Sequence, residues 1–155
     1  MQSKSAEIEY RQYVEEFSDM VTRLCVLHTG NFTDAEDCYQ NVFLKLYTQM
    51  CKGEIPNVKA WLIRVTLNEC RSALRHSLGK STVELDEVTA ICEDKHEFEL
   101  LDAVYKLPAK YRDVIYLYYY EELSIEEIAV SMKSNKNTVK SRLKRGREKL
   151  KDFLT

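Results

Sequence analysis

Residues 124–150 read SIEEIAVSMKSNKNTVKSRLKRGREKL, and the fold can be inferred most directly from this segment. Ser124 followed three residues later by Glu127 is a capping box, which predicts the start of a short helix that reaches Met132. Asn135 is a favourable N-cap and predicts a second helix that continues to about Leu154. Two helices joined by so short a turn are typical of a helix-turn-helix.

Apolar side chains recur at three- and four-residue spacing in both helices, which gives each helix one apolar side. The first helix contributes Ile125, Ile128, Ala129 and Met132, and the second contributes Val139, Leu143 and Leu150. Small Ala129 would let the two helices cross closely.

Positive charge is concentrated in the same stretch. From Lys133 to Lys151 there are nine basic residues and a single acidic one, although the whole chain has a net charge of −2. In this motif the first residues of the second helix reach base edges in the major groove, and the helix dipole favours a nearby phosphate. A solvated amphipathic helix that ends a small bundle is the alternative, but so one-signed a face favours DNA.

The segments on either side of residue 97 differ in predicted structure and in charge. Residues 98–155 predict four helical segments, with Pro108 in the first turn of the second, which runs to about Glu122. Residues 79–97 are polar and acidic, with two basic and six acidic side chains, which is typical of a solvated linker.

Residues 1–78 predict three helices that could share one core. Residues 6–27 carry an apolar face, a turn follows at residues 30–31, and Thr33 with Glu36 predicts a capping box for the second helix. Gly53 and Pro56 mark a loop, after which Asn57 is the expected N-cap of a third helix that reaches about His76. The predicted fold is therefore all-α, with two small helical domains (1–78 and 98–155) joined by a flexible linker (79–97).

A stripe of polar and basic residues follows the third helix. Its members are spaced by four, three, four, three and four residues, so they share a face: Asn57, Trp61, Arg64, Asn68, Arg71 and Arg75. Arginines pair with phosphates and rings stack on bases, so this face suits a single-stranded nucleic acid. A core position for Trp61 with ordinary surface arginines remains an equal alternative.

No residue set indicates an enzyme, a metal site or a cofactor. Carboxylates at Asp34, Glu36 and Asp37 suit the first turn of a helix. The five cysteines are scattered, without a CxxC pair, and predict reduced thiols in a cytoplasmic protein. No run of about 18 apolar residues and no signal peptide is present.

Four motifs in order resemble the extracytoplasmic-function (ECF) sigma factors, the smallest members of the major bacterial sigma family. Residues 34–43, DAEDCYQNVF, are similar to the family's DAED-x-x-Q-x-x-F signature, and residues 61–75, WLIRVTLNECRSALR, to its WL-x-R-I-A-x-N helix. Residues 107–129 and 138–150 are similar to its promoter-binding end. The resemblance covers nearly the whole chain, as region 2, a linker and region 4.

The resemblance implies roles for particular residues. The residues expected to dock on the β′ clamp helices of core RNA polymerase are Asp34, Glu36, Asp37 and Gln40. Those expected to bind and open the −10 element are Asn57, Lys59, Trp61, Arg64, Asn68, Arg71 and Arg75. Those expected to read the −35 element are Lys136, Asn137, Thr138, Lys140, Ser141 and Arg142, while Lys144, Arg145 and Arg147 would mostly contact phosphates.

The same resemblance implies the partners. They are core RNA polymerase, through its β′ clamp helices and its β flap, promoter DNA, and an anti-sigma protein as regulator, with no small-molecule substrate. The expected location is the cytoplasm, on the nucleoid within holoenzyme or at the membrane when an anti-sigma protein holds the chain there.

Three positions depart from the family pattern. Lys133, Ser134 and Asn135 stand where Gly, Ile or Val, and Ser are common, which predicts a looser turn or a changed docking angle. Gly146 replaces a usual Ala inside the last helix at a cost of about 1 kcal/mol in helix propensity. Ser72 stands where Asp is common.

Two other functions fit parts of the pattern. An autonomous helix-turn-helix regulator would bind its operator tightly without polymerase, usually as a dimer, but the chain has no long heptad pattern and no ligand domain. A protein-interaction module whose basic helix binds an acidic partner would show no preference for DNA sequence.

Overall fold

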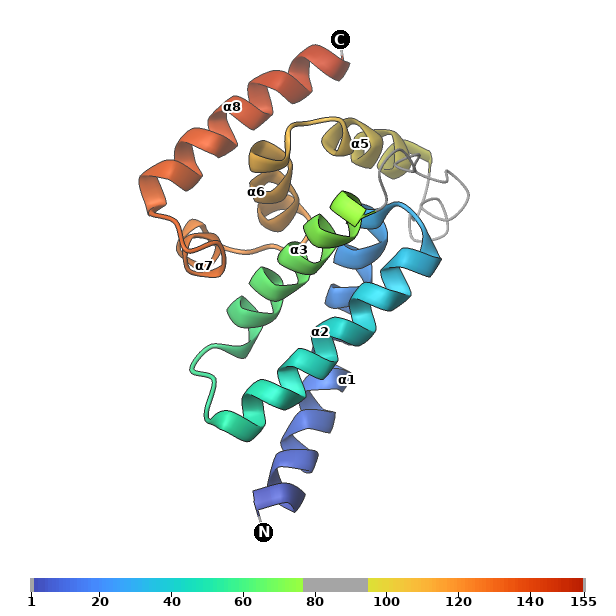
Figure 1. The fold of residues 1–155 in the computed structure, drawn as a ribbon. Helices are drawn as coiled ribbons and strands as arrows, with labels where there is room; N and C mark the ends of the chain where they lie inside the picture. Colours follow the sequence, from blue (N-terminus) through green and yellow to red (C-terminus); the bar gives the residue numbers. More distant parts are fainter. Residues whose placement is uncertain (1, 77–94, 155) are drawn as a thin grey trace. The chain divides into compact units, whose positions relative to one another are not determined.

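The computed structural model describes residues 2–76 and 95–154, and the elements in these ranges are all helices (Figure 1). The chain divides into two compact units, Met1–Val88 and Thr89–Thr155. This agrees with the predicted all-α fold of two helical domains. Most of the predicted linker lies outside the described residues, although its last three positions, 95–97, already belong to a helix.

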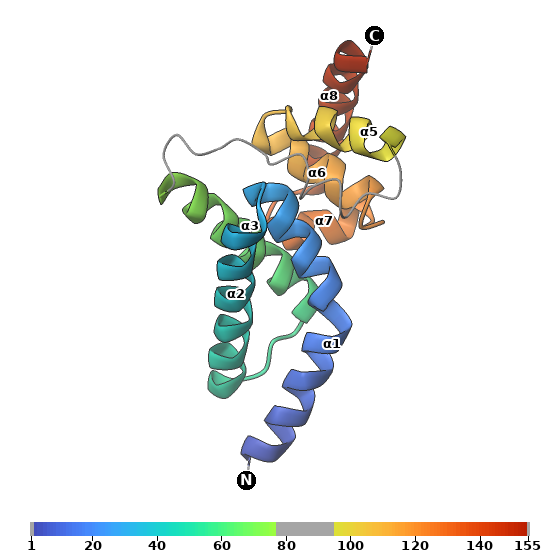
Figure 2. The same cartoon turned by 90° about the vertical axis from the view of Figure 1, so that its right-hand side faces the viewer.

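The first unit is a three-helix bundle of α1 (Gln2–Thr29), α2 (Phe32–Lys52) and α3 (Val58–His76), which all pack against one another (Figures 1 and 2). Every helix contributes fully buried side chains to one core. They include Val21 and Leu24 of α1, Val42 and Leu46 of α2, and Leu62 and Ile63 of α3. Bundling buries the apolar face that no single helix could bury alone.

The start of α2 differs from its prediction. Asn31, rather than Thr33, is the N-cap: its side-chain oxygen accepts from the Asp34 backbone N–H at 2.8 Å, and its amide group donates to the Asp34 carboxylate at 2.9 Å. Helix α2 therefore begins at Phe32. The expected capping box of Thr33 and Glu36 is wrong because Asn31 already fills this role and Gly30, at φ 83°, ends the preceding turn.

The start of α3 agrees with its prediction. The Asn57 side chain accepts a hydrogen bond from the Ala60 backbone N–H at 3.1 Å. The N-cap thus fixes where the polar stripe of α3 begins.

The second unit consists of α5 (Lys95–Tyr105), α6 (Ala109–Tyr119), α7 (Ile125–Ser131) and α8 (Lys136–Leu154). Its core is built around Val114, Ile115 and Leu117 of α6, with Ile128 of α7 and Leu143 of α8 fully or almost fully buried beside them. Helix α6 ends at Tyr119, three residues before its predicted end, and Glu122 then takes a left-handed φ of 55°.

Gly146 has a packing role in this unit that helix propensity does not reveal. It is buried in α8, and a Cβ built there would lie 2.8 Å from Cγ1 and 3.1 Å from Cδ1 of Ile115 on α6. Because Ile115 is itself fully buried, it has no free space into which to move. Glycine at 146 therefore permits a close approach of α6 and α8, which offsets its cost inside the helix.

Candidate nucleic-acid interface

The turn between α7 and α8 is a hydrogen-bonded one. Ser124 and Glu127 form the predicted capping box, and at the other end of α7 the Ser134 N–H donates to the Ala129 carbonyl at 2.9 Å and the Lys133 N–H donates to the Val130 carbonyl at 3.3 Å. These two bonds are a Schellman motif. Lys133 takes a φ of 50°, the left-handed region in which the family commonly has glycine. The turn is thus closed by hydrogen bonds in spite of its unusual sequence.

The start of α8 is also fixed as predicted. The Asn135 side chain accepts from the Thr138 N–H at 2.8 Å. Val139, Leu143 and Gly146 face the core of the unit, so the opposite side of α8 is presented to solvent.

That solvent side has an uncharged strip between two basic rows. Asn137 and Ser141, one turn apart and both exposed, form the strip. One row consists of Lys136, Lys140, Lys144 and Arg147, and the other of Arg142, Arg145 and Lys149, with Thr138 at its start. All nine residues expected to contact a −35 element are exposed or half-exposed. Polar side chains that can read bases thus lie between cations that can meet phosphates on either side of a groove.

The first row is tied to its surroundings at both ends. Lys136 pairs with Glu126 of α7 at 3.6 Å, and the Glu126 backbone N–H together with this lysine holds the pKa of Glu126 below its usual value. Arg147 donates to the Tyr119 hydroxyl at 2.6 Å and lies over the rings of Tyr118 and Tyr119. Arg147 is therefore held against α6, which narrows the range of phosphates that it could reach.

The second row borders a polar hollow of about 450 Å³ that sequence reasoning did not anticipate. Lys110 and Tyr111, in the first turn of α6, line it together with Asn135, Asn137, Thr138, Ser141, Arg142 and Arg145. The hollow thus includes the uncharged strip. Lys110 belongs to a different helix, and only the packing of α6 against α8 brings it to the site.

In the first unit, the polar stripe of α3 is present in part as predicted. Trp61 and Arg64 are half-buried, while Asn68 and Arg71 are exposed, and all four lie on the side of α3 away from Leu62 and Ile63. Trp61 therefore is not a core residue, and the stripe can present a ring and basic groups to a ligand.

Three expected members of the −10 set differ from this group. Asn57 is exposed but uses its side-chain oxygen as the cap of α3. Lys59, two residues before Trp61, projects from another side of the helix. Arg75 lies on α3 at a stripe position, and its side chain is outside the described part of the structure.

The residues expected to dock on polymerase lie on α2. Glu36, Asp37 and Gln40 are exposed, and the Gln40 amide donates to Glu36 at 3.5 Å. Asp34 is only half-exposed and its carboxylate is bonded to Asn31 in the N-cap. Asp34 is therefore a structural residue of the helix start in the free chain.

Leu44 is a further residue of this face that the sequence analysis did not single out. It lies one turn beyond Gln40, and 64% of its surface is exposed. Polar Asn41, Lys45 and Thr48 surround it on the helix, and each is exposed. A large apolar side chain in the middle of an exposed polar face is typical of a contact with a partner.

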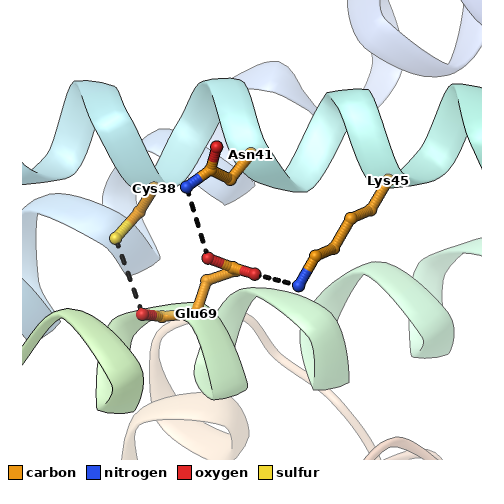
Figure 3. Close-up of polar contacts among 4 residues, drawn as sticks. All are labelled: Cys38, Asn41, Lys45 and Glu69. Atoms are coloured by element: carbon orange, nitrogen blue, oxygen red, sulfur yellow. Dashed lines mark hydrogen bonds and ion pairs between the residues drawn. The ribbon is translucent and has the colours of Figure 1, made fainter.

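Glu69 of α3 joins the α2 face to the α3 stripe (Figure 3). Its carboxylate forms an ion pair with Lys45 and accepts from the Asn41 amide at 3.5 Å, and its carbonyl accepts from the Cys38 thiol at 3.8 Å. The Glu69 side chain is mostly buried, with 13% exposed, so these bonds are better shielded than those of a surface pair. They hold the two candidate surfaces of the first unit in one arrangement.

Potential metal ligands in the described part of the chain are its His, Cys, Asp and Glu side chains, and they include the thiol of Cys38. No group of three or more His, Cys, Asp or Glu side chains in residues 2–76 and 95–154 could hold a metal ion. A hydrogen bond with Cys70 and burial raise the pKa of the Cys38 thiol, so it stays protonated. None of the described helices is long and apolar enough to cross a membrane.

Two family comparisons match the two units separately. Residues 13–77 match sigma-70 region 2, and residues 97–150 match sigma-70 region 4. The chain is 29% identical to the ECF RNA polymerase sigma factor SigW of Bacillus subtilis, over 97% of this chain and 91% of that protein. It is also 29% identical to the ECF RNA polymerase sigma factor SigE of Mycolicibacterium smegmatis, of whose length it spans 63%.

Solved structures support the same fold. The structure of CnrH in complex with the cytosolic domain of CnrY aligns with a TM-score of 0.78 at 21% identity, over 98% of this chain and 93% of that chain. The sigma factor RpoE in complex with the anti-sigma factor NepR from Bartonella quintana aligns with a TM-score of 0.72 at 22% identity, over 94% and 96% of the two chains.

Proposed function

The chain belongs to the sigma-70 family of RNA polymerase sigma factors, in its ECF group, and on this premise we propose that its two units act at two promoter elements. The proposed boundaries are residues 1–78 for the core-polymerase and −10 unit and residues 98–155 for the −35 unit, joined by the linker 79–97. Sigma factors are initiation factors rather than enzymes, and we propose no catalytic activity for this chain.

The exposed side of α8 is the observation that carries this proposal. Asn137 and Ser141 lie between two basic rows on the second helix of a helix-turn-helix. A recognition helix in the major groove needs polar side chains at its centre for bases and cations at its flanks for phosphates. We therefore propose that α8 reads the −35 element.

The stripe on α3 suits the other promoter element. Trp61 offers a partly exposed ring, and Arg64 and Arg71 offer positive charge on the same side of the helix. A ring can stack on an unpaired base while the arginines neutralise the phosphates of an opened strand. This supports binding of the −10 element in its single-stranded form.

Helix α2 is the proposed docking element for core polymerase. Its face combines the acidic Glu36 and Asp37 with the amide of Gln40 and the exposed Leu44. An apolar anchor within a polar rim is the usual composition of a stable protein interface. We propose the β′ clamp helices as the partner of α2 and the β flap as a contact of the second unit.

Tethering explains why two modest DNA surfaces can give a selective complex. Each unit alone would bind weakly, but holding both on polymerase makes the second contact intramolecular and raises its effective concentration. Free duplex DNA should accordingly bind the isolated chain weakly, with an affinity that falls steeply as salt is added. An autonomous regulator would instead bind its operator tightly without polymerase.

We also propose an anti-sigma protein as regulator. The fold is shared with a sigma factor that was solved together with an anti-sigma factor, and that partner is a property of the other protein. The proposed place of action is the cytoplasm, on the nucleoid within holoenzyme or at the membrane when the regulator is anchored there.

The decisive experiment is co-elution of the purified full-length chain with bacterial core RNA polymerase on gel filtration. Asp37→Arg reverses an exposed charge on the docking face and should lose or weaken the complex, whereas Glu16→Arg makes the same change on an exposed position of α1 and should not. Failure of the wild-type chain to co-elute at low salt, combined with a specific shift of a duplex by the chain alone, would overturn the sigma assignment in favour of the autonomous regulator.

A further inference from the structure

The strongest unassigned feature is the hollow between the first turn of α6 and the start of α8. Two lysines lie against the Tyr111 ring, and two arginines line the hollow beside it. The Lys110 Nζ lies 5.0 Å and the Lys149 Nζ 5.8 Å from the centre of the Tyr111 ring, and Arg142 and Arg145 line the hollow beside it. Among the described residues, no carboxylate forms an ion pair with any of these four cations.

The positive charges around the hollow affect the pKa of the Tyr111 hydroxyl. A hydrogen bond with Arg145 and the charge of nearby Lys110 hold the pKa of Tyr111 below its usual value. The ring itself is 7% exposed and cannot move away from the hollow without disturbing the core of the unit.

Neutral polar side chains complete the lining: Asn135, Asn137, Thr138 and Ser141. The Asn135 oxygen is used in capping α8, which leaves its NH₂ group as a donor. Lys110 and Tyr111 lie in the first turn of α6, so the positive end of the α6 dipole lies near the hollow. The hollow, of about 450 Å³, is open to solvent and could admit a phosphate group that remains part of a DNA strand.

We propose that this hollow is a subsite for one phosphate of the DNA backbone, in which Lys110 of α6 acts together with Arg142 and Arg145 of α8. The inference rests on the proposed DNA-binding function and deepens it. A phosphodiester brings a single negative charge, several acceptor oxygens and an attached sugar, which matches uncompensated cations, neutral donors and an open, polar cavity. Because Lys110 lies outside the helix-turn-helix, it fixes the rotation of α8 about the groove and carries no sequence information.

The test compares the full-length chain with Lys110→Gln on duplex DNA by fluorescence anisotropy at several salt concentrations. We expect Lys110→Gln to weaken binding about three- to ten-fold on every sequence and to lower the slope of log Kd against log salt by about 0.9, the value for one phosphate. Lys106→Gln is the matched control, because Lys106 is an exposed lysine of the same unit that already pairs with Asp102 at 3.2 Å. An unchanged slope for Lys110→Gln, or an equal loss for Lys106→Gln, overturns the inference.

Two further measurements separate the possible sources of the phosphate. A methylphosphonate scan of the duplex should find one position at which removing the charge weakens the wild type but not Lys110→Gln. Stabilisation of the wild type by inorganic phosphate that Lys110→Gln abolishes, without any such position in the DNA, would identify a free-anion site and overturn the DNA assignment.

These outcomes are distinguishable from failure of the proposed function itself. If the wild-type chain does not form a complex with core polymerase, the sigma assignment fails, whatever the behaviour of Lys110. If the wild type forms that complex and the Lys110 variant keeps the full salt slope, the subsite alone fails.

Discussion

Leu44 is a single apolar side chain that α2 leaves in solvent, where it gains nothing for folding. Because 64% of its surface is exposed, removing it should have little effect on the stability of the first unit. Its neighbours on the proposed docking face, Asp37 and Gln40, are polar and could be satisfied by water. The apolar contact is therefore the part of the docking face whose contribution appears only in the complex.

We expect Leu44→Glu to reduce the affinity for core polymerase at least about ten-fold, since a central apolar anchor is worth about 1.4 kcal/mol or more. Thermal unfolding of the free chain should stay within a few degrees of the wild type. Thr48→Glu, the same charge one turn away, is the control and should have a smaller effect. Equal losses from both variants would indicate a general charge effect and no anchor.

Lys133 shows how one residue can be strained inside a well-formed turn. Its φ of 50° is costly for a side chain with a Cβ, by about 1–2 kcal/mol, whereas glycine reaches this region freely but loses more chain entropy on folding. We expect Lys133→Gly to stabilise the second unit by a net of about 0.5–1 kcal/mol, as measured by urea unfolding. Glu122→Gly, at φ 55°, should behave alike, while a loss of stability in both would contradict the assigned backbone conformation.

At the scale of elements, the approach of α6 to α8 is governed by Gly146 and Ile115. Alanine at 146 would gain about 1 kcal/mol of helix propensity, but its Cβ would lie 2.8 Å from a buried carbon of Ile115, and such overpacking costs about 1–3 kcal/mol. The contact cost is therefore expected to exceed the propensity gain.

We expect Gly146→Ala to destabilise the second unit by about 1 kcal/mol in urea unfolding, even though glycine is a poor helix former. Ser141→Ala, on the exposed side of the same helix, provides the comparison and should be neutral or slightly stabilising. Stabilisation by both substitutions would show that Ile115 lies farther from position 146 than the 2.8 Å between its Cγ1 and a built Cβ.

The elements also show which features sequence reasoning can reach. Caps at Ser124, Asn57 and Asn135 were predictable because the cap is a local hydrogen bond between a short polar side chain and a backbone N–H two or three residues on. At α2 the prediction of Thr33 was wrong, because Asn31, assigned to the preceding turn, supplies the capping hydrogen bond. The reason for Gly146 could not be read from the chain, since Ile115, which requires it, is distant in sequence.

The residues of the candidate site also include some that the sequence predicts and some that it does not. The outward positions of α8 and the stripe of α3 follow from helical spacing alone. Lys110 and Leu44 do not, because one joins the site only through packing of α6 against α8 and the other is defined by exposure, which depends on the whole bundle. Arg147 was expected on phosphates but is bound to Tyr119, a contact that no spacing rule could predict.

At the scale of the whole molecule, the net charge is −2 while one face of one helix is strongly basic. The −35 contact is proposed for α8 of the second unit, whereas the main polymerase contact is proposed for α2 of the first unit. Substitutions on the exposed side of α8 should therefore leave the docking of α2 on polymerase unaffected.

We expect the triple variant Lys140→Gln, Arg142→Gln, Arg145→Gln to co-elute with core polymerase as the wild type does but to lose selective transcription from a pool of randomised promoters. The salt slope of free-DNA binding should fall by about 2–3, since three phosphate contacts are removed. Loss of polymerase binding in this variant, without unfolding, would mean that the second unit provides the main contact with the enzyme.

The close approach at Gly146 has a consequence for anyone who wishes to reprogram this sigma factor. Its recognition helix cannot be exchanged as a free-standing cassette, because a donor helix with a bulkier residue at that position would be pushed away from α6 and would enter the groove at another tilt. The base-reading surface should instead be changed in place, by substituting the residues at 137 and 141 on the resident backbone. Alternatively, α6 and α8 should be moved together as a matched pair.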